Sequence, residues 1–270
     1  MSASGALFLI AFVAYVISAG LYGASFAMKT DSAMVYARPA VWIGFLFHTL
    51  SIGATCLITH HGPFISTFST FSATAWFLVL LYIPSEARVR PPALGVVTLP
   101  VVCLILVIGV ARANKEIGDS KLLQSHIINL HVLLMVLSFG LFLLAAACAA
   151  LYLAQNRSLK RHKSNGWFRR LPPLDTLDRL AYHTTAYGVS LFTLGLVLGV
   201  ERAMSGGLAP GWQTDPRVLA SYILWLIYVF YLIARAIGGW RGSRLNYLLL
   251  IGPLVAITIY FLPATAHHFG

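Results

Sequence analysis

One long stretch of this chain carries no charge. It spans Leu122–Leu153, reads LLQSHIINLHVLLMVLSFGLFLLAAACAALYL, and lies in a charge-free region between Lys121 and Arg157. About 20 consecutive apolar residues are enough for a helix to cross the hydrocarbon core of a bilayer. The stretch therefore predicts a transmembrane helix, and this helix carries two histidines, His126 and His131, near its amino end.

Apolar segments of similar length recur along the whole chain. The eight predicted helices cover residues 5–27, 40–60, 64–85, 93–111, 125–154, 179–201, 217–238 and 245–264. The 270 residues are 59% hydrophobic and 10% charged, a composition that excludes an ordinary soluble domain. We therefore predict an all-α, polytopic membrane protein with about eight transmembrane helices in a single integral membrane domain, residues 1–270. The first segment has no basic stretch before it, so we expect a retained helix rather than a signal peptide.

The basic residues divide unevenly between the loops. When alternate loops are assigned to opposite sides, fourteen of the 19 Lys and Arg residues fall on one side. Cytoplasmic loops carry an excess of Lys and Arg, which places both termini outside and predicts the bacterial inner (cytoplasmic) membrane. This topology accounts for the net charge of +11, so we expect no nucleic-acid partner. The basic run 157–170 is expected to contact anionic lipid headgroups of the bilayer, or a soluble partner protein.

The nine histidines gather toward the predicted outer face. Six of them map to the outer parts of three predicted helices: His60, His61, His126, His131, His267 and His268. Neutral imidazole binds heme iron, zinc or copper. A protein metal site would usually add carboxylates or thiolates, whereas two imidazoles across an uncharged aromatic platform suit heme better. The alternative, without a ligand site, is that these histidines form hydrogen bonds to water or lipid headgroups at the membrane boundary.

Residues of two other kinds could complete an outer heme site. Aromatic side chains near this face could supply flat packing for a porphyrin: Trp212, Tyr222, Phe261 and Phe269. Arg202 and Arg217 could meet its propionates. The three cysteines lie inside apolar segments and form no CxxC pair, which disfavours covalent heme attachment to this chain.

Several polar residues lie toward the predicted inner side. His48 and His183 map to comparable depth, and we expect either polar contacts between helices or a second pair of ligands. Asp175 and Asp178 precede the sixth apolar segment, where carboxylates favour the helix dipole. Arg235 ends the seventh segment and can extend its charge toward the membrane surface.

Four segments resemble one family of membrane proteins. The first is SHIINLHVLLMVLSFGLFLLAA, which contains His131, and the second is LDRLAYHTTAYGVSLFTLGLVLGVERA, followed by the loop GWQTDPR with Trp212 and Asp215. The third is the ending AHHFG, and the fourth is His61 in the sequence His-Gly-Pro. These segments resemble the cytochrome c assembly family of heme-handling proteins, the CcsA/CcmC group, with its WWD loop, HSYG ending and GHFP element.

The resemblance implies a ligand set and partners. It implies that His131 and His267 are the axial ligands of a non-covalently bound heme b, with Trp212 and Asp215 shaping the platform and His61 beside it. It also implies apocytochrome c and a CcsB-like subunit as partners. The earlier tryptophans of the WWD loop are missing, which favours a heme-binding role over a complete heme-attachment enzyme.

The small size and eight segments resemble the HemX/YpjD-like branch of this family. That branch implies an alternative function: a membrane regulator of heme biosynthesis that acts on glutamyl-tRNA reductase through the basic loop 157–170. A transporter is a lower alternative, because no carboxylate lies at a helix centre.

Overall fold

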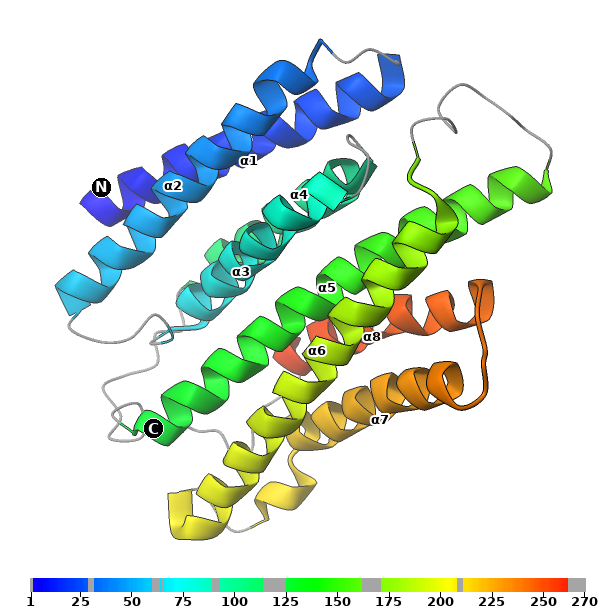
Figure 1. Ribbon diagram of the computed structural model, residues 1–270. Coiled ribbons are helices and arrows are strands. Elements are labelled where there is room, and N and C mark those ends of the chain that lie inside the picture. The colour runs from blue at the N-terminus through cyan, green and yellow to red at the C-terminus, as the bar shows by residue number, and fades with distance from the viewer. Residues whose placement is uncertain are drawn as a thin grey trace. The chain divides into compact units, whose positions relative to one another are not determined.

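A computed structural model describes residues 2–28, 32–59, 64, 66–88, 93–113, 125–161, 171–207 and 211–261 (Figure 1). Every element within these ranges is helical. The α-helices are α1 (Ala3–Met28), α2 (Met34–Thr59), α3 (Thr67–Arg88), α4 (Ala93–Ala111), α5 (His126–Lys160), α6 (Leu174–Arg202), α7 (Pro216–Ala236) and α8 (Ser243–Phe261). Between α6 and α7 lie a π-helical turn, η2 (Ala203–Gly207), and a 3-10 turn, η3 (Trp212–Thr214).

Seven of the described helices, α1 to α7, are long and apolar enough to cross a membrane. Helix α8 is also largely apolar, over a stretch that includes Ser243–Ala256. The prediction of an all-α, multi-pass membrane protein is confirmed, and the seven such helices among the described residues roughly match the predicted count of about eight. The orientation of the termini stays a prediction.

Three helices extend more than one turn beyond an end that hydropathy predicted. Helix α2 begins at Met34 instead of residue 40, α5 ends at Lys160 instead of residue 154, and α6 begins at Leu174 instead of residue 179. The added turns are polar and include Arg38 and Asp178. Helical backbone hydrogen bonds are internal to the segment and do not depend on side-chain polarity, so a helix can continue where an apolar run stops.

The contacts divide the chain into two compact units. The first unit contains Met1–Glu116 and Ala150–Leu177, and the second contains Ile117–Ala149 and Asp178–Gly270. In the first unit α1 packs against α2 and α4, while α3 packs against α4 and α2. In the second unit α7 packs against α8 and η3. The prediction of a single domain over residues 1–270 stays a prediction.

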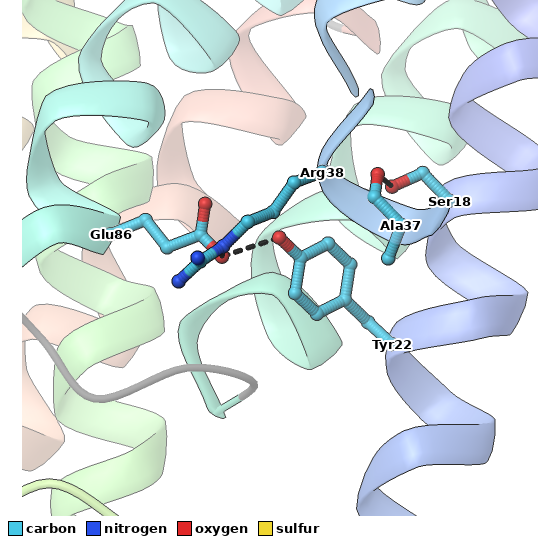
Figure 2. A network of polar contacts seen from close by, with 5 residues as sticks. All are labelled: Ser18, Tyr22, Ala37, Arg38 and Glu86. Atoms are coloured by element: carbon cyan, nitrogen blue, oxygen red, sulfur yellow. Dashed lines mark hydrogen bonds and ion pairs between the residues drawn. The ribbon is translucent and has the colours of Figure 1, made fainter. Parts of the chain in front are cut away.

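A polar network joins three helices of the first unit. Figure 2 shows the Tyr22 hydroxyl of α1 directed at the Glu86 carboxylate of α3, to which it donates a hydrogen bond. The guanidinium of Arg38, from α2, lies beside the same carboxylate with Nε 3.5 Å from Oε1. Nearby, the Ser18 hydroxyl donates to the Ala37 carbonyl at 2.8 Å. Because Tyr22 is fully buried and Arg38 is half exposed, the tyrosine bond is the better shielded of the two contacts to Glu86.

Aromatic rings form the core of the second unit. The Phe142 ring of α5 stacks on the Tyr228 ring of α7 with centroids 3.9 Å apart. The same Phe142 meets Phe192 of α6 edge to face at 5.7 Å. Such aromatic pairs contribute about 0.5–1.5 kcal/mol beyond the area they bury. One phenylalanine therefore fixes α5 against both α6 and α7.

Candidate functional site

A stripe of three glycines lets α6 approach α5 closely. Gly188, Gly195 and Gly199 are spaced by seven and four residues, which places them on one face of the helix. A Cβ atom at these positions would lie 2.6 Å from Phe142, 3.0 Å from Met135 and 2.8 Å from His131, respectively. Small residues at a helix interface allow this close packing in membranes. The stripe therefore leaves space for side chains of α5, including the imidazole of His131.

His131 lies in the second turn of α5 and is half-buried. Its Nδ1 is 2.6 Å from the carbonyl oxygen of Gly195. A carbonyl can only accept a hydrogen bond, so Nδ1 is the donor, and in the neutral ring the basic lone pair belongs to Nε2. Histidines that ligate metals usually donate their other N–H in this way, to a backbone carbonyl or a carboxylate. The contact fixes both the tautomer and the direction of the ring.

A groove of about 750 Å³ lies between α6 and α7. Its lining is largely apolar and consists of Thr193, Leu196, Val197, Val200, Glu201, Met204, Ser205, Tyr222 and Trp225. The Trp225 indole donates to the Thr193 hydroxyl at 2.8 Å and ties the two walls together. His131 is not among the lining residues, and the glycine stripe occupies another face of α6. Of the predicted aromatic platform, Tyr222 is thus placed in this groove.

The loop residues Trp212 and Asp215 have a clear local role. Asp215 is fully buried, and its carboxylate accepts a hydrogen bond from the Arg217 backbone N–H at 2.8 Å. It is the N-cap of α7, and Pro216 occupies the first helical turn. Trp212 is half-buried and opens η3 after Gly211, whose φ of 89° favours glycine. The segment therefore sets the start of α7, and its predicted role in a heme platform stays a prediction.

His48 and His183 lie in different units. His48 is fully buried in the first unit, with Nδ1 3.4 Å from the Tyr15 hydroxyl and Nε2 2.9 Å from the Ser72 hydroxyl. It therefore makes the polar contact between helices that the sequence suggested. His183 is exposed on α6 in the second unit, and its ring meets that of Tyr182 at 5.4 Å. Their pairing as ligands stays a prediction.

Two predicted site residues, His61 and His267, lie outside the described residues, as do His60, His268 and Phe269. Within the described ranges, no group of three or more His, Cys, Asp or Glu side chains could hold a metal ion. A site built only from protein carboxylates, thiolates and imidazoles is therefore not formed by these residues. Heme iron needs at most two axial ligands from the protein and does not depend on such a cluster.

Sequence reasoning missed two features of the second unit. The first is the glycine stripe, although the spacing of Gly195 and Gly199 is a recognised signal of close helix packing. The second is an ion pair between Arg235 and Asp178, with Nη2 and Oδ2 2.7 Å apart. The Arg235 guanidinium also lies over the Tyr182 ring, 4.6 Å from its centroid. No spacing rule joins α6 to α7 across 57 residues, so this pair could be found only from the fold.

Comparison with known proteins identifies one family model and a set of similar relatives. The family model described as cytochrome C assembly protein matches residues 64–266. Protein HemX of Brevibacillus brevis is 30% identical over 70% of this chain and 72% of its own length. Protein HemX of Bacillus subtilis is 26% identical over 86% and 84%, and the cytochrome c biogenesis protein CcsA of Chlorella vulgaris is 28% identical over 74% and 73%. The chain belongs to the cytochrome c assembly protein family.

Proposed function

We propose that this protein binds heme b non-covalently and handles it for cytochrome c assembly, with His131 and His267 as the axial ligands. The observation that supports the proposal most directly is the 2.6 Å contact between His131 Nδ1 and the Gly195 carbonyl. It gives His131 the tautomer and the fixed ring direction that an iron ligand needs. Membership of the cytochrome c assembly family supports the choice of heme as the ligand.

The chain's own residues have distinct parts in this proposal. Gly195 and Gly199 hold the His131 ring in place on α5. Trp212 and Asp215 define the turn that starts α7, and His61 lies near the platform in the family pattern. Heme, when bound, supplies a redox-active iron and vinyl groups, which thioether formation with an apocytochrome uses. Apocytochrome c and a CcsB-like subunit are the partners that this role requires.

The test compares two histidines of the same helix by absorption spectroscopy of the purified protein. His131→Gly is expected to lower the bound heme and the α-band several-fold, and added imidazole should restore them. His126→Gly is the matched control, because His126 is exposed at the first position of α5 and should leave both unchanged. Unaltered heme content and spectrum in a His131→Ala/His267→Ala double variant would remove the assignment.

Regulation of heme biosynthesis is a second candidate function. Two of the similar relatives carry the name HemX, and the resemblance to that branch supports this candidate. In this proposal the basic segment 157–170 contacts soluble glutamyl-tRNA reductase. Arg157 and Lys160 are two of its exposed basic residues and lie at the end of α5. An Arg157→Ser/Lys160→Ser variant should keep its heme spectrum and change the cellular level of the reductase. An unchanged reductase level would contradict this candidate function.

The membrane and the orientation of the protein in it are inferred from the basic segment 157–170. We propose the bacterial inner membrane with both termini outside, because this places the basic segment 157–170 in the cytoplasm. Accessibility of single cysteines to a membrane-impermeant maleimide checks the orientation in intact cells. A cysteine at position 160 should be protected and one at position 2 should react.

A further inference from the structure

The groove between α6 and α7 follows the carboxyl-terminal part of α6. Its lining on this side runs from Thr193 to Ser205, which is roughly 18 Å at about 1.5 Å per residue. Both α6 and α7 are long and apolar enough to cross a membrane. The hydrocarbon core of a bilayer is about 30 Å thick, so one leaflet contributes about 15 Å of it. The groove therefore has about the length of the acyl chains of one leaflet.

The polar groups at the inner end of the groove, near the middle of α6, are already paired. The Thr193 hydroxyl donates to the Val189 carbonyl at 2.7 Å and accepts from the Trp225 indole at 2.8 Å. The indole has a single N–H, which this bond uses. The lining next to this pair is apolar and includes Leu196 and Val197. A polar group of a ligand would lose its hydrogen bonds to water here, whereas a hydrocarbon chain loses none.

The other end of the groove carries charged side chains. Glu201 lines this end and is exposed. Arg202 follows it in the chain, and its Nη1 donates to the Ser205 hydroxyl at 3.3 Å. Because Ser205 also lines the groove, this contact holds the guanidinium beside the groove's end. A carboxylate and a guanidinium thus lie together where α6 ends, the level at which lipid headgroups meet a transmembrane helix.

The two charges limit which lipid fits best. A phosphatidylethanolamine headgroup has one phosphate and one primary ammonium. The phosphate is a preferred partner of a guanidinium, and the ammonium can donate hydrogen bonds to a carboxylate. Phosphatidylglycerol has no cationic group for Glu201, and the quaternary ammonium of phosphatidylcholine has no N–H to donate. Phosphatidylethanolamine alone among these three satisfies both side chains.

We propose that this groove is a binding site for phosphatidylethanolamine. One acyl chain lies along α6 and ends against the Thr193–Trp225 pair. The ammonium group bonds to Glu201, and the phosphate contacts Arg202. Met204, which lines the groove, is 77% exposed, so the groove is open at this point for a lipid to enter from the side. The site goes beyond the proposed heme function and does not depend on it, because His131 packs against another face of α6.

Native mass spectrometry of the purified protein in detergent tests the headgroup assignment with phosphatidylethanolamine, phosphatidylglycerol and phosphatidylcholine of identical acyl chains. The protein should bind one phosphatidylethanolamine about tenfold more tightly than either other lipid. Glu201→Gln should abolish the difference between phosphatidylethanolamine and phosphatidylcholine. Asp175→Asn is the matched control, because it neutralises an exposed carboxylate at the opposite end of α6 and should keep the preference. Equal binding of the three lipids, or an unchanged preference in Glu201→Gln, overturns the proposal.

A second pair of variants tests the position of the acyl chain. Val197→Trp fills the groove and should weaken binding of phosphatidylethanolamine several-fold. Leu194→Trp is the control, because Leu194 lies outside the groove lining and is 55% exposed, close to the 59% of Val197. Equal effects of the two variants contradict the groove as the site. Heme is the competing occupant: heme-loaded and heme-free protein should bind the lipid equally, and displacement of the lipid by heme would overturn the proposal.

Discussion

His131 Nδ1 and the Gly195 carbonyl oxygen are 2.6 Å apart, a hydrogen bond that joins a polar side chain of α5 to the backbone of α6. The carbonyl already belongs to a helix, so the imidazole uses its second lone pair. Substitution at Gly195 cannot remove this acceptor. The space around the ring is therefore what mutation can change, and that space is set by Gly199.

Gly199→Ala should displace the His131 ring. The added Cβ would lie 2.8 Å from His131 Cε1, closer than real Cβ contacts, and 3.0 Å from Nδ1. We expect heme affinity to fall about tenfold, roughly 1.4 kcal/mol, with a shifted Soret band. Heme titration of the apoprotein measures this. Gly20→Ala is the control, because a Cβ there meets nothing within 4 Å; it should leave the titration unchanged, and equal effects of the two variants would contradict the positioning role.

Asp215→Ala should destabilise the start of α7. The variant loses the N-cap acceptor for the Arg217 N–H, which costs about 1 kcal/mol. Asp215→Ser keeps a capping oxygen without the charge and should recover most of the lost Tm. Thermal unfolding followed by circular dichroism gives both values. If Asp215→Ser recovers stability but not heme binding, the carboxylate has a role beyond the cap.

Ser72→Ala should weaken the first unit without affecting the heme spectrum. It removes the hydroxyl 2.9 Å from His48 Nε2 and leaves a fully buried imidazole nitrogen short of a partner. The expected cost is about 1–3 kcal/mol in the free energy of unfolding. Chemical denaturation measures the cost. Ser190→Ala serves as control, because the exposed Ser190 hydroxyl donates to the Ala186 carbonyl of its own helix. A changed α-band with unchanged stability would instead favour His48 as a ligand.

Tyr22→Phe should destabilise more than Arg38→Ala. Both residues contact Glu86, but Tyr22 is fully buried whereas the Arg38 side chain is 50% exposed. A buried hydrogen bond to a charged group contributes about 1.5–3 kcal/mol, and an exposed ion pair about 0–1 kcal/mol. Chemical denaturation of both single variants and of the double variant separates the contributions of the two contacts to the free energy of unfolding. An Arg38→Ala effect as large as that of Tyr22→Phe would contradict this ranking.

Hydropathy predicted the helical class and most helix positions because apolar length is a local property of the chain. It misplaced helix ends such as the start of α2, since the turn that carries Arg38 is helical yet polar. Sequence reasoning also assigned Asp178 to the helix dipole and expected Arg235 to reach toward the membrane surface. The structure joins them in one ion pair, which depends on the packing of α6 against α7.

The candidate site was predictable only in part. His131 could be selected from its place in a charge-free segment and from the family resemblance. Its hydrogen-bond partner could not, because that partner is a backbone carbonyl 64 residues away whose exposure depends on glycine spacing in α6. Asp215 was selected for a platform, and its capping role was overlooked although Asp-Pro before an apolar run is a helix-start signal.

The glycine stripe of α6 also bears on the order of assembly in the membrane. Each glycine inside a helix costs about 1 kcal/mol relative to alanine, so α6 is weakened by the same residues that let it dock. Transmembrane helices associate through such close contacts after they insert. Helix α6 thus gains its full stability only when α5 is already beside it. A nascent chain that stopped before Gly195 would leave His131 without this backbone acceptor.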